Sequence, residues 1–124
     1  MVGNLRTNVS LFHPALTPDP VKNLKAALNK RKPSVTLNWD PPDSSVVGEN
    51  CITKYNIRFK TEGGLYNEKT VGKSATNIVL GKSLGLKPLL EYNFEVRARN
   101  TYIAGKWETV MAYVGKQSFV EGPH

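Results

Sequence analysis

Apolar and polar residues alternate along several short segments of the chain. Every second residue is apolar over residues 35–39, and the same alternation recurs over 52–60 and 92–99. Side chains of a β-strand point alternately to its two faces, so a period of two indicates strands with one buried and one solvated face. Residues 92–99 carry the strongest strand signal of the three.

Weaker alternations over residues 21–28, 66–71, 76–80 and 107–114 predict further strands, of which 66–71 is polar enough for a sheet edge. A basic turn at 30–33, two prolines at 41–42 and two glycines at 63–64 separate the segments. No segment of about ten residues holds a helical period. The pattern predicts an all-β, seven-stranded antiparallel β-sandwich and excludes parallel α/β folds.

The inward positions of these strands form one predicted core. Burying each side chain contributes roughly 1.5–3 kcal/mol, which can hold two sheets together without covalent links. The residues are Trp39, Tyr55, Ile57, Phe59, Tyr92, Phe94 and Val96. We expect three parts: an extended N-terminal lead-in or linker over 1–19, the domain over 20–114, and a C-terminal tail over 115–124.

Catalytic and metal-binding residues are scarce. Cys51 is the single cysteine, so an intrachain disulfide and a cysteine zinc site are excluded, and we interpret it as a small filler residue. Both histidines, His13 and His124, lie in the predicted tails, and no nucleophile-elbow, zinc-protease or phosphate-loop motif occurs. We expect no enzyme, no metal and no cofactor.

Targeting signals are equally sparse. No run approaches the roughly 18 apolar residues of a membrane helix, so we expect no membrane insertion by this chain. Asn8-Val9-Ser10 fits the N-glycosylation acceptor pattern, and the sequence leaves its occupancy open.

Charge is the least ordinary property of the composition. Seventeen Lys and Arg against ten Asp and Glu leave a net charge of +7 over 124 residues. If the apolar set points inward, five cations must share the outer face of one sheet: Lys54, Arg58, Lys60, Arg97 and Arg99. This predicts either a surface for an anionic partner, in which Glu95 tempers the five cations, or a solvated face whose charge Glu62, Glu68 or Glu108 offsets.

The loop over residues 100–106 is a candidate protein contact. Tyr102 and Ile103 lie at its predicted tip between paired strands, where apolar groups would be exposed, although Ile103 could instead fold back onto the core. Trp107 follows the loop, and it could cover the end of the sandwich or stack on basic side chains.

Four pieces of the chain, in order, resemble a fibronectin type III domain from about Pro20 to Val114. They are Pro20-Val21-Lys22-Asn23-Leu24, Val35-Thr36-Leu37-Asn38-Trp39-Asp40-Pro41-Pro42, residues 52–59, and residues 86–100, which end in an Ala-x-Asn signature. The resemblance implies that Trp39 is the core tryptophan. It also implies that Tyr92, after the Leu86-Lys87-Pro88 turn, is a corner tyrosine whose hydroxyl bonds to backbone upstream.

Two family features are absent. The family usually carries Gly-Thr or similar small residues where this chain has Leu89-Leu90, and Arg-Gly-Asp does not occur. The integrin-binding motif of some members therefore cannot be carried over.

The resemblance implies a non-catalytic protein-binding or spacer module. We expect it to belong to a larger cell-surface or extracellular adhesion or receptor protein and to be monomeric in isolation, with an intracellular location left open. The alternative is a polyanion-binding domain that uses the basic sheet face for a glycosaminoglycan. Nucleic acid is less favoured, because the face lacks the interleaved aromatics that stack on bases.

Overall fold

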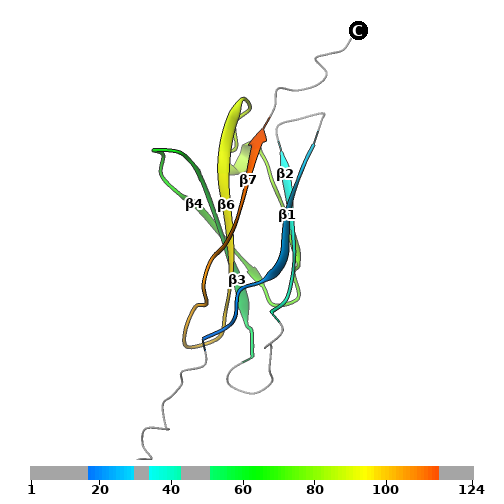
Figure 1. Cartoon of the computed structure of the whole chain (residues 1–124), viewed down its shortest axis with the longest axis vertical. Helices are drawn as coiled ribbons and strands as arrows, with labels where there is room; N and C mark the ends of the chain where they lie inside the picture. The colour runs from blue at the N-terminus through cyan, green and yellow to red at the C-terminus, as the bar shows by residue number, and fades with distance from the viewer. Residues whose placement is uncertain (1–16, 30–33, 43–50, 115–124) are drawn as a thin grey trace, which may run out of the picture.

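The computed structural model describes residues 17–29, 34–42 and 51–114, which form two antiparallel sheets packed face to face (Figure 1). The three-stranded sheet has the order β1-β2-β5, with β1 at Lys22–Leu28, β2 at Val35–Asp40 and β5 at Asn77–Leu80. The four-stranded sheet has the order β4-β3-β6-β7, with β4 at Asn67–Gly72, β3 at Lys54–Thr61, β6 at Leu90–Arg99 and β7 at Glu108–Val114. The predicted seven-stranded all-β sandwich is confirmed.

Several sequence predictions fall outside the described residues. They are most of the lead-in over 1–19, the basic turn at 30–33, the tail over 115–124 and the glycosylation acceptor Asn8. Within the described part, Pro18 is buried, and a Cβ on Gly105 would lie within 2.4 Å of the Pro18 carbonyl oxygen. Close packing on the β6–β7 loop therefore begins just before the predicted domain boundary.

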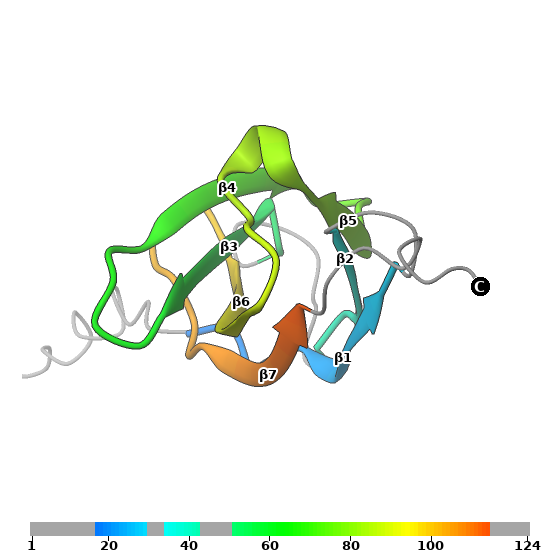
Figure 2. The same ribbon diagram turned by 90° about the horizontal axis from the view of Figure 1, so that it is seen from above.

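The inward residues of both sheets form one core. Figure 2 shows the two sheets between which it lies. All seven predicted core residues are at most 3% exposed. Trp39 packs on Tyr55 with ring centroids 5.5 Å apart, and Phe59 lies 5.8 Å from Tyr92 and 5.7 Å from Phe94. Aromatic contacts of this kind add to the free energy of area burial, so the core needs no disulfide.

Tyr92 links the start of β6 to the turn before it. Its hydroxyl accepts a hydrogen bond from the backbone N–H of Lys87 at 2.9 Å, and its ring is 3% exposed. This is the arrangement that the family resemblance implies. Leu86, which opens the turn, is 1% exposed and is part of the core.

The chain departs from the family pattern at Leu89, and the backbone shows the consequence. Leu89 has φ 66°, in the left-handed region where glycine is preferred, and its N–H donates to the carbonyl of Val114. The residues shortly before this corner form a 3-10 helix, η2 (Lys82–Leu84), which ends at Gly85 with φ 94°. No α-helix occurs in the described ranges.

The start of the described chain and the end of β7 lie at opposite ends of the sandwich. In Figure 1 the described chain begins beside the β6–β7 loop, whereas β7 ends at the opposite pole. The β6–β7 loop and its exposed tip therefore lie at the pole where the chain enters the domain.

Candidate functional site

The five predicted cations all lie on the outer face of the four-stranded sheet, on β3 and β6. The register between these strands places Lys54 opposite Arg99, Arg58 opposite Glu95, and Lys60 opposite Asn93. Two cations therefore face each other directly only at the Lys54 end. The sequence predicted the shared face but not which residues lie opposite one another.

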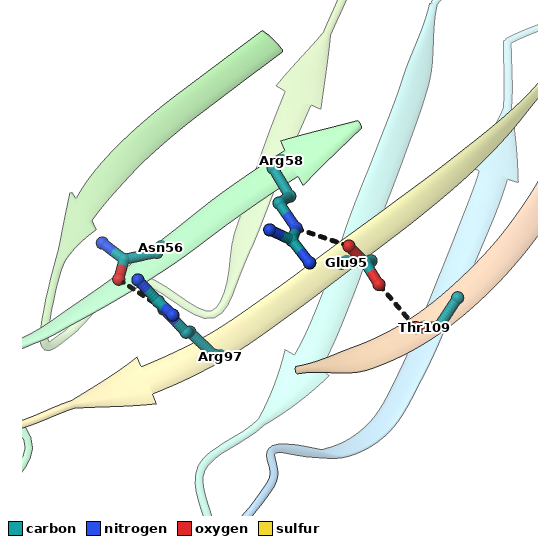
Figure 3. A network of polar contacts seen from close by, with 5 residues as sticks. All are labelled: Asn56, Arg58, Glu95, Arg97 and Thr109. Atoms are coloured by element: carbon teal, nitrogen blue, oxygen red, sulfur yellow. Dashed lines mark hydrogen bonds and ion pairs between the residues drawn. The ribbon is translucent and has the colours of Figure 1, made fainter. Parts of the chain in front are cut away.

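Arg58 is neutralised at the centre of the face. Its Nε lies 2.5 Å from Glu95 Oε1, and Glu95 Oε2 accepts a hydrogen bond from Thr109 Oγ1 at 3.1 Å (Figure 3). Glu95 points to the outer face but is only 9% exposed, because neighbouring side chains cover it. Within the described residues the ion pair with a cation of this set is made by Glu95, and not by Glu62, Glu68 or Glu108, which the sequence offered as the offsetting acids.

Two aromatic rings cover the same arginine. The Arg58 guanidinium carbon lies 4.1 Å from the ring centroid of Tyr66 and 4.0 Å from that of Trp107. Arg97 contacts the Trp107 ring at 4.2 Å, and Lys60 Nζ contacts the Tyr66 ring at 4.8 Å. We call this chain of contacts, Lys60–Tyr66–Arg58–Trp107–Arg97, the cation–π stack. Such contacts each contribute about 0.5–2 kcal/mol.

Arg97 is held by a further bond within the face. Its Nε donates to Asn56 Oδ1 at 2.9 Å (Figure 3). Burial lowers the pKa of Arg97, and the positive charges of Arg99 and Arg58 lower it further, while Glu68 acts in the opposite direction. The guanidinium stays protonated at neutral pH. Burial is thus the main cause of the lowered pKa, and repulsion by the neighbouring arginines is the second.

Lys54 and Arg99 form the contrasting end of the face. Lys54 is exposed, and its side chain makes no hydrogen bond or ion pair with any described residue. Arg99 Nε reaches only the backbone carbonyl of Asn100, at 3.5 Å. Both side chains border a shallow depression that is also lined by Thr53, Asn56, Thr70, Asn100 and Thr101. We call it the Lys54–Arg99 depression; no carboxylate lines it among the described residues.

Lys60, at the other end of β3, has acidic neighbours. It lines a second depression together with Glu62 and Glu91, beside the apolar side chains of Leu90 and Met111. The positive charge of the face is therefore concentrated towards the Lys54 end.

The β6–β7 loop is built around Asn100, which is 1% exposed. Asn100 Oδ1 accepts hydrogen bonds from the backbone N–H groups of Tyr102 and Ile103, at 2.8 and 2.9 Å. The Asn100 N–H donates to the carbonyl of Ile103 at 3.0 Å, which closes the turn. Tyr102 is 65% exposed and Ile103 is 39% exposed, so neither side chain belongs to the core.

Sequence reasoning missed part of this arrangement. The pattern predicts Tyr66 as the first residue of a strand, but Tyr66 precedes β4, and its ring contacts Arg58 and Lys60. The pattern also predicts Trp107 as the first residue of the last strand, whereas β7 begins at Glu108. Of the two roles predicted for the Trp107 ring, the structure shows stacking on basic side chains, those of Arg58 and Arg97. Aromatic residues that flank strands near a run of outward cations are the signal that could have indicated the stack.

Two further features were sought among the residues that the structure describes: a group of side chains that could hold a metal ion, and a helix that could span a membrane. No group of three or more His, Cys, Asp or Glu side chains is placed to hold a metal ion there. Within the same residues, no helix is long and apolar enough to cross a membrane.

Comparison with solved structures shows the same fold in several proteins. Domains A168–A170 of titin match with a TM-score of 0.64 and 22% identity, covering 81% of this chain and 33% of that one. The chicken CNTN1 FN1–FN3 domains match with a TM-score of 0.64 and 17% identity, covering 78% and 30%. The twitchin kinase region from C. elegans matches with a TM-score of 0.63 and 21% identity, covering 81% and 17%.

The chain thus spans a third or less of each of these three structures. No curated protein matches it. The sequence itself matches the family described as Fibronectin type III domain over residues 19–112, which includes all seven strands up to Ala112. The chain therefore belongs to the fibronectin type III family, whose domains are generally non-catalytic modules common in adhesion, receptor and muscle proteins.

Proposed function

We propose that this domain is a non-catalytic protein-binding module that contacts its partner through the β6–β7 loop. The observation that carries the proposal is the exposed Tyr102 on a turn that the buried Asn100 side chain holds in place. Tyrosine supplies a large contact area with few rotatable bonds, and a preformed loop loses little conformational entropy on binding. Both properties favour a binding role over that of a plain spacer.

The domain works within a larger cell-surface or extracellular protein. The similar structures from titin, CNTN1 and twitchin are each more than twice as long as this chain, which supports a multidomain parent. The acceptor triplet at Asn8 supports passage through the secretory pathway. Expression in mammalian cells with a secretion signal, followed by glycosidase treatment and mass spectrometry, tests this part; an unmodified Asn8 would remove its support.

The alternative, a polyanion-binding face built from all five cations, is less favoured by the geometry. Arg58 is paired with Glu95, and Arg97 is bonded to Asn56 and stacked on Trp107. A long sulfated chain gains its affinity from many charge contacts in a row, and two members of this row already have partners within the domain.

The test of loop binding places a photo-crosslinking amino acid at position 102 of the chain displayed on cells. The matched control carries it at Val79, which is 59% exposed on β5 of the other sheet. Crosslinks to a defined protein at 102 and not at 79 are expected.

The crosslinked protein is then purified for affinity measurements. Tyr102→Ser should weaken its binding about tenfold or more, as for a central aromatic contact, and Val79→Ser should not. Equal crosslinking at both positions, or no change with Tyr102→Ser, would contradict the proposal.

A further inference from the structure

We propose that the Lys54–Arg99 depression binds a carboxylate of an acidic segment in the protein partner. The inference rests on the proposed function, because the depression adjoins the β6–β7 loop and would be covered by the same partner. It adds the chemistry of that partner: side-chain carboxylates placed beside an apolar group that packs on Tyr102.

The first argument is the pairing of like charges. Lys54 and Arg99 are directly opposite each other on β3 and β6. Like charges at such positions destabilise a sheet, and no described carboxylate lies in the depression to relieve them. An incoming carboxylate would sit between an ammonium and a guanidinium, which together can supply charge-assisted hydrogen bonds from two sides.

The second argument is the supply of uncharged donors. Thr70 Oγ1 accepts a hydrogen bond from Asn56 Nδ2 at 3.2 Å, so its own hydroxyl proton can be donated to a ligand. Thr101 is exposed at the rim, in the loop. The Thr53 hydroxyl already donates to the Arg99 carbonyl and is therefore not counted among these donors. The hydroxyl groups of Thr70 and Thr101, beside a pair of cations, complete a site for an anionic oxygen.

The third argument concerns the size of the anion. Lys54 and Lys60 are six residues apart on β3, or about 20 Å at roughly 3.3 Å per residue. Between them lie Arg58 and Arg97, which are engaged within the domain, and Lys60 has Glu62 and Glu91 beside it. The cations with neither a side-chain partner nor an acidic neighbour within the domain are thus confined to one end, which fits a local acidic group better than an extended polysaccharide.

The fourth argument is continuity with the loop. Asn100 and Thr101 line the depression, and Tyr102 follows them at 65% exposure. A ligand carboxylate in the depression would therefore place the next residues of an acidic segment against the loop tip. A segment in which glutamate or aspartate alternates with an apolar residue would fit both the Lys54–Arg99 depression and the exposed Tyr102 ring.

Amide chemical shifts of the full chain provide the test. The probe is an acetylated, amidated pentapeptide of alternating glutamate and leucine, and its control has glutamine in place of glutamate. The glutamate peptide should shift the amides of Lys54, Arg99, Thr101 and Tyr102, with at least about tenfold weaker binding for the glutamine peptide. A heparin-derived hexasaccharide is titrated in parallel.

Two double variants separate the site from general charge. Lys54→Gln with Arg99→Gln should weaken glutamate-peptide binding about tenfold. Lys25→Gln with Lys82→Gln removes the same charge from β1 and η2 and should leave binding within about twofold, since neither side chain lines the depression and exposed charges outside it are screened by salt.

Each other result overturns the inference. Equal shifts of Tyr102 and Ile103 with the glutamate and glutamine peptides would remove the carboxylate site and leave loop binding intact. Shifts running from Lys54 to Lys60 with the hexasaccharide alone would assign the face to a polysaccharide. No shift at about 10 mM glutamate peptide would show that the depression does not bind carboxylates even at millimolar affinity.

Discussion

The centre and the Lys54 end of the outer face contain the same kinds of residue in different situations. At the centre, Arg58 and Arg97 contact Trp107, and both are hydrogen-bonded by acceptors from the neighbouring strand. At the end, Lys54 and Arg99 face each other beside an open depression. The comparison shows that cations on one sheet face can divide into a group that stabilises the fold and a group available to a partner.

The division has a physical cause in the order of residues along the two strands. Arg58 lies opposite Glu95, so a carboxylate is within reach of its guanidinium. Lys54 lies opposite a second cation, and the aromatic rings that could cover it are placed nearer the centre. Solvated cations retain their full attraction for an incoming anion, whereas paired cations must first give up an internal partner.

The largest expected effect comes from removing the ring at the centre of the stack. Trp107→Ala should lower the free energy of unfolding by about 3 kcal/mol, because two guanidinium groups lose their cation–π contact and an apolar surface is exposed. Chemical denaturation followed by circular dichroism measures it. Tyr102→Ala, at the exposed loop tip, is the aromatic control and should cost less than about 1 kcal/mol. Similar losses in the two variants would contradict a structural role for the stack.

Glu95→Gln should make the centre of the face resemble the Lys54 end, because Arg58 loses its ion-pair partner. We expect a loss of about 2 kcal/mol of unfolding free energy, since Arg58 is left without its anion in a half-buried position. At the same time the freed charge should increase retention on a heparin column. Glu91→Gln removes the same charge from an exposed position on the same strand and face. If it changes stability and retention as much as Glu95→Gln, the ion pair has no special role.

Tyr92→Phe is a reference for the stability losses expected above, because it removes a single hydrogen bond, the one from the Lys87 N–H to the Tyr92 hydroxyl. The Lys87 N–H then loses its acceptor, and unfolding free energy should fall by about 1–2 kcal/mol with the fold retained. The urea midpoint and the amide spectrum measure both quantities. An unchanged midpoint would mean that the corner bond contributes nothing net to stability.

The smallest stability effect is expected at the Lys54 end. Lys54→Gln with Arg99→Gln should leave the urea midpoint unchanged or slightly raised, because a repulsive pair is removed and no described partner of Lys54 is lost. Retention on a heparin column should nevertheless fall. A clear drop in stability would show that these residues belong with the structural group, and the comparison would fail.

Much of the fold could be predicted from local pattern. The alternation over β3 and β6 identified Tyr55, Phe59 and Phe94 as inward residues, and all are at most 1% exposed. The contacts of residues just outside the strands could not be predicted from this alternation. The rings of Tyr66 and Trp107 contact Arg58 on β3, and a period of two contains no information about contacts between separate segments.

The sequence by itself determined that the domain is a β-sandwich, which face of each strand is buried, and that five cations share one outer face. These properties follow from the two-residue period of a strand, which is local. Only the tertiary structure decided that Arg58 meets Glu95, that Trp107 covers two arginines, and that Lys54 lies opposite Arg99. Those pairings depend on strand register and loop path, which the chain as a whole sets through long-range packing.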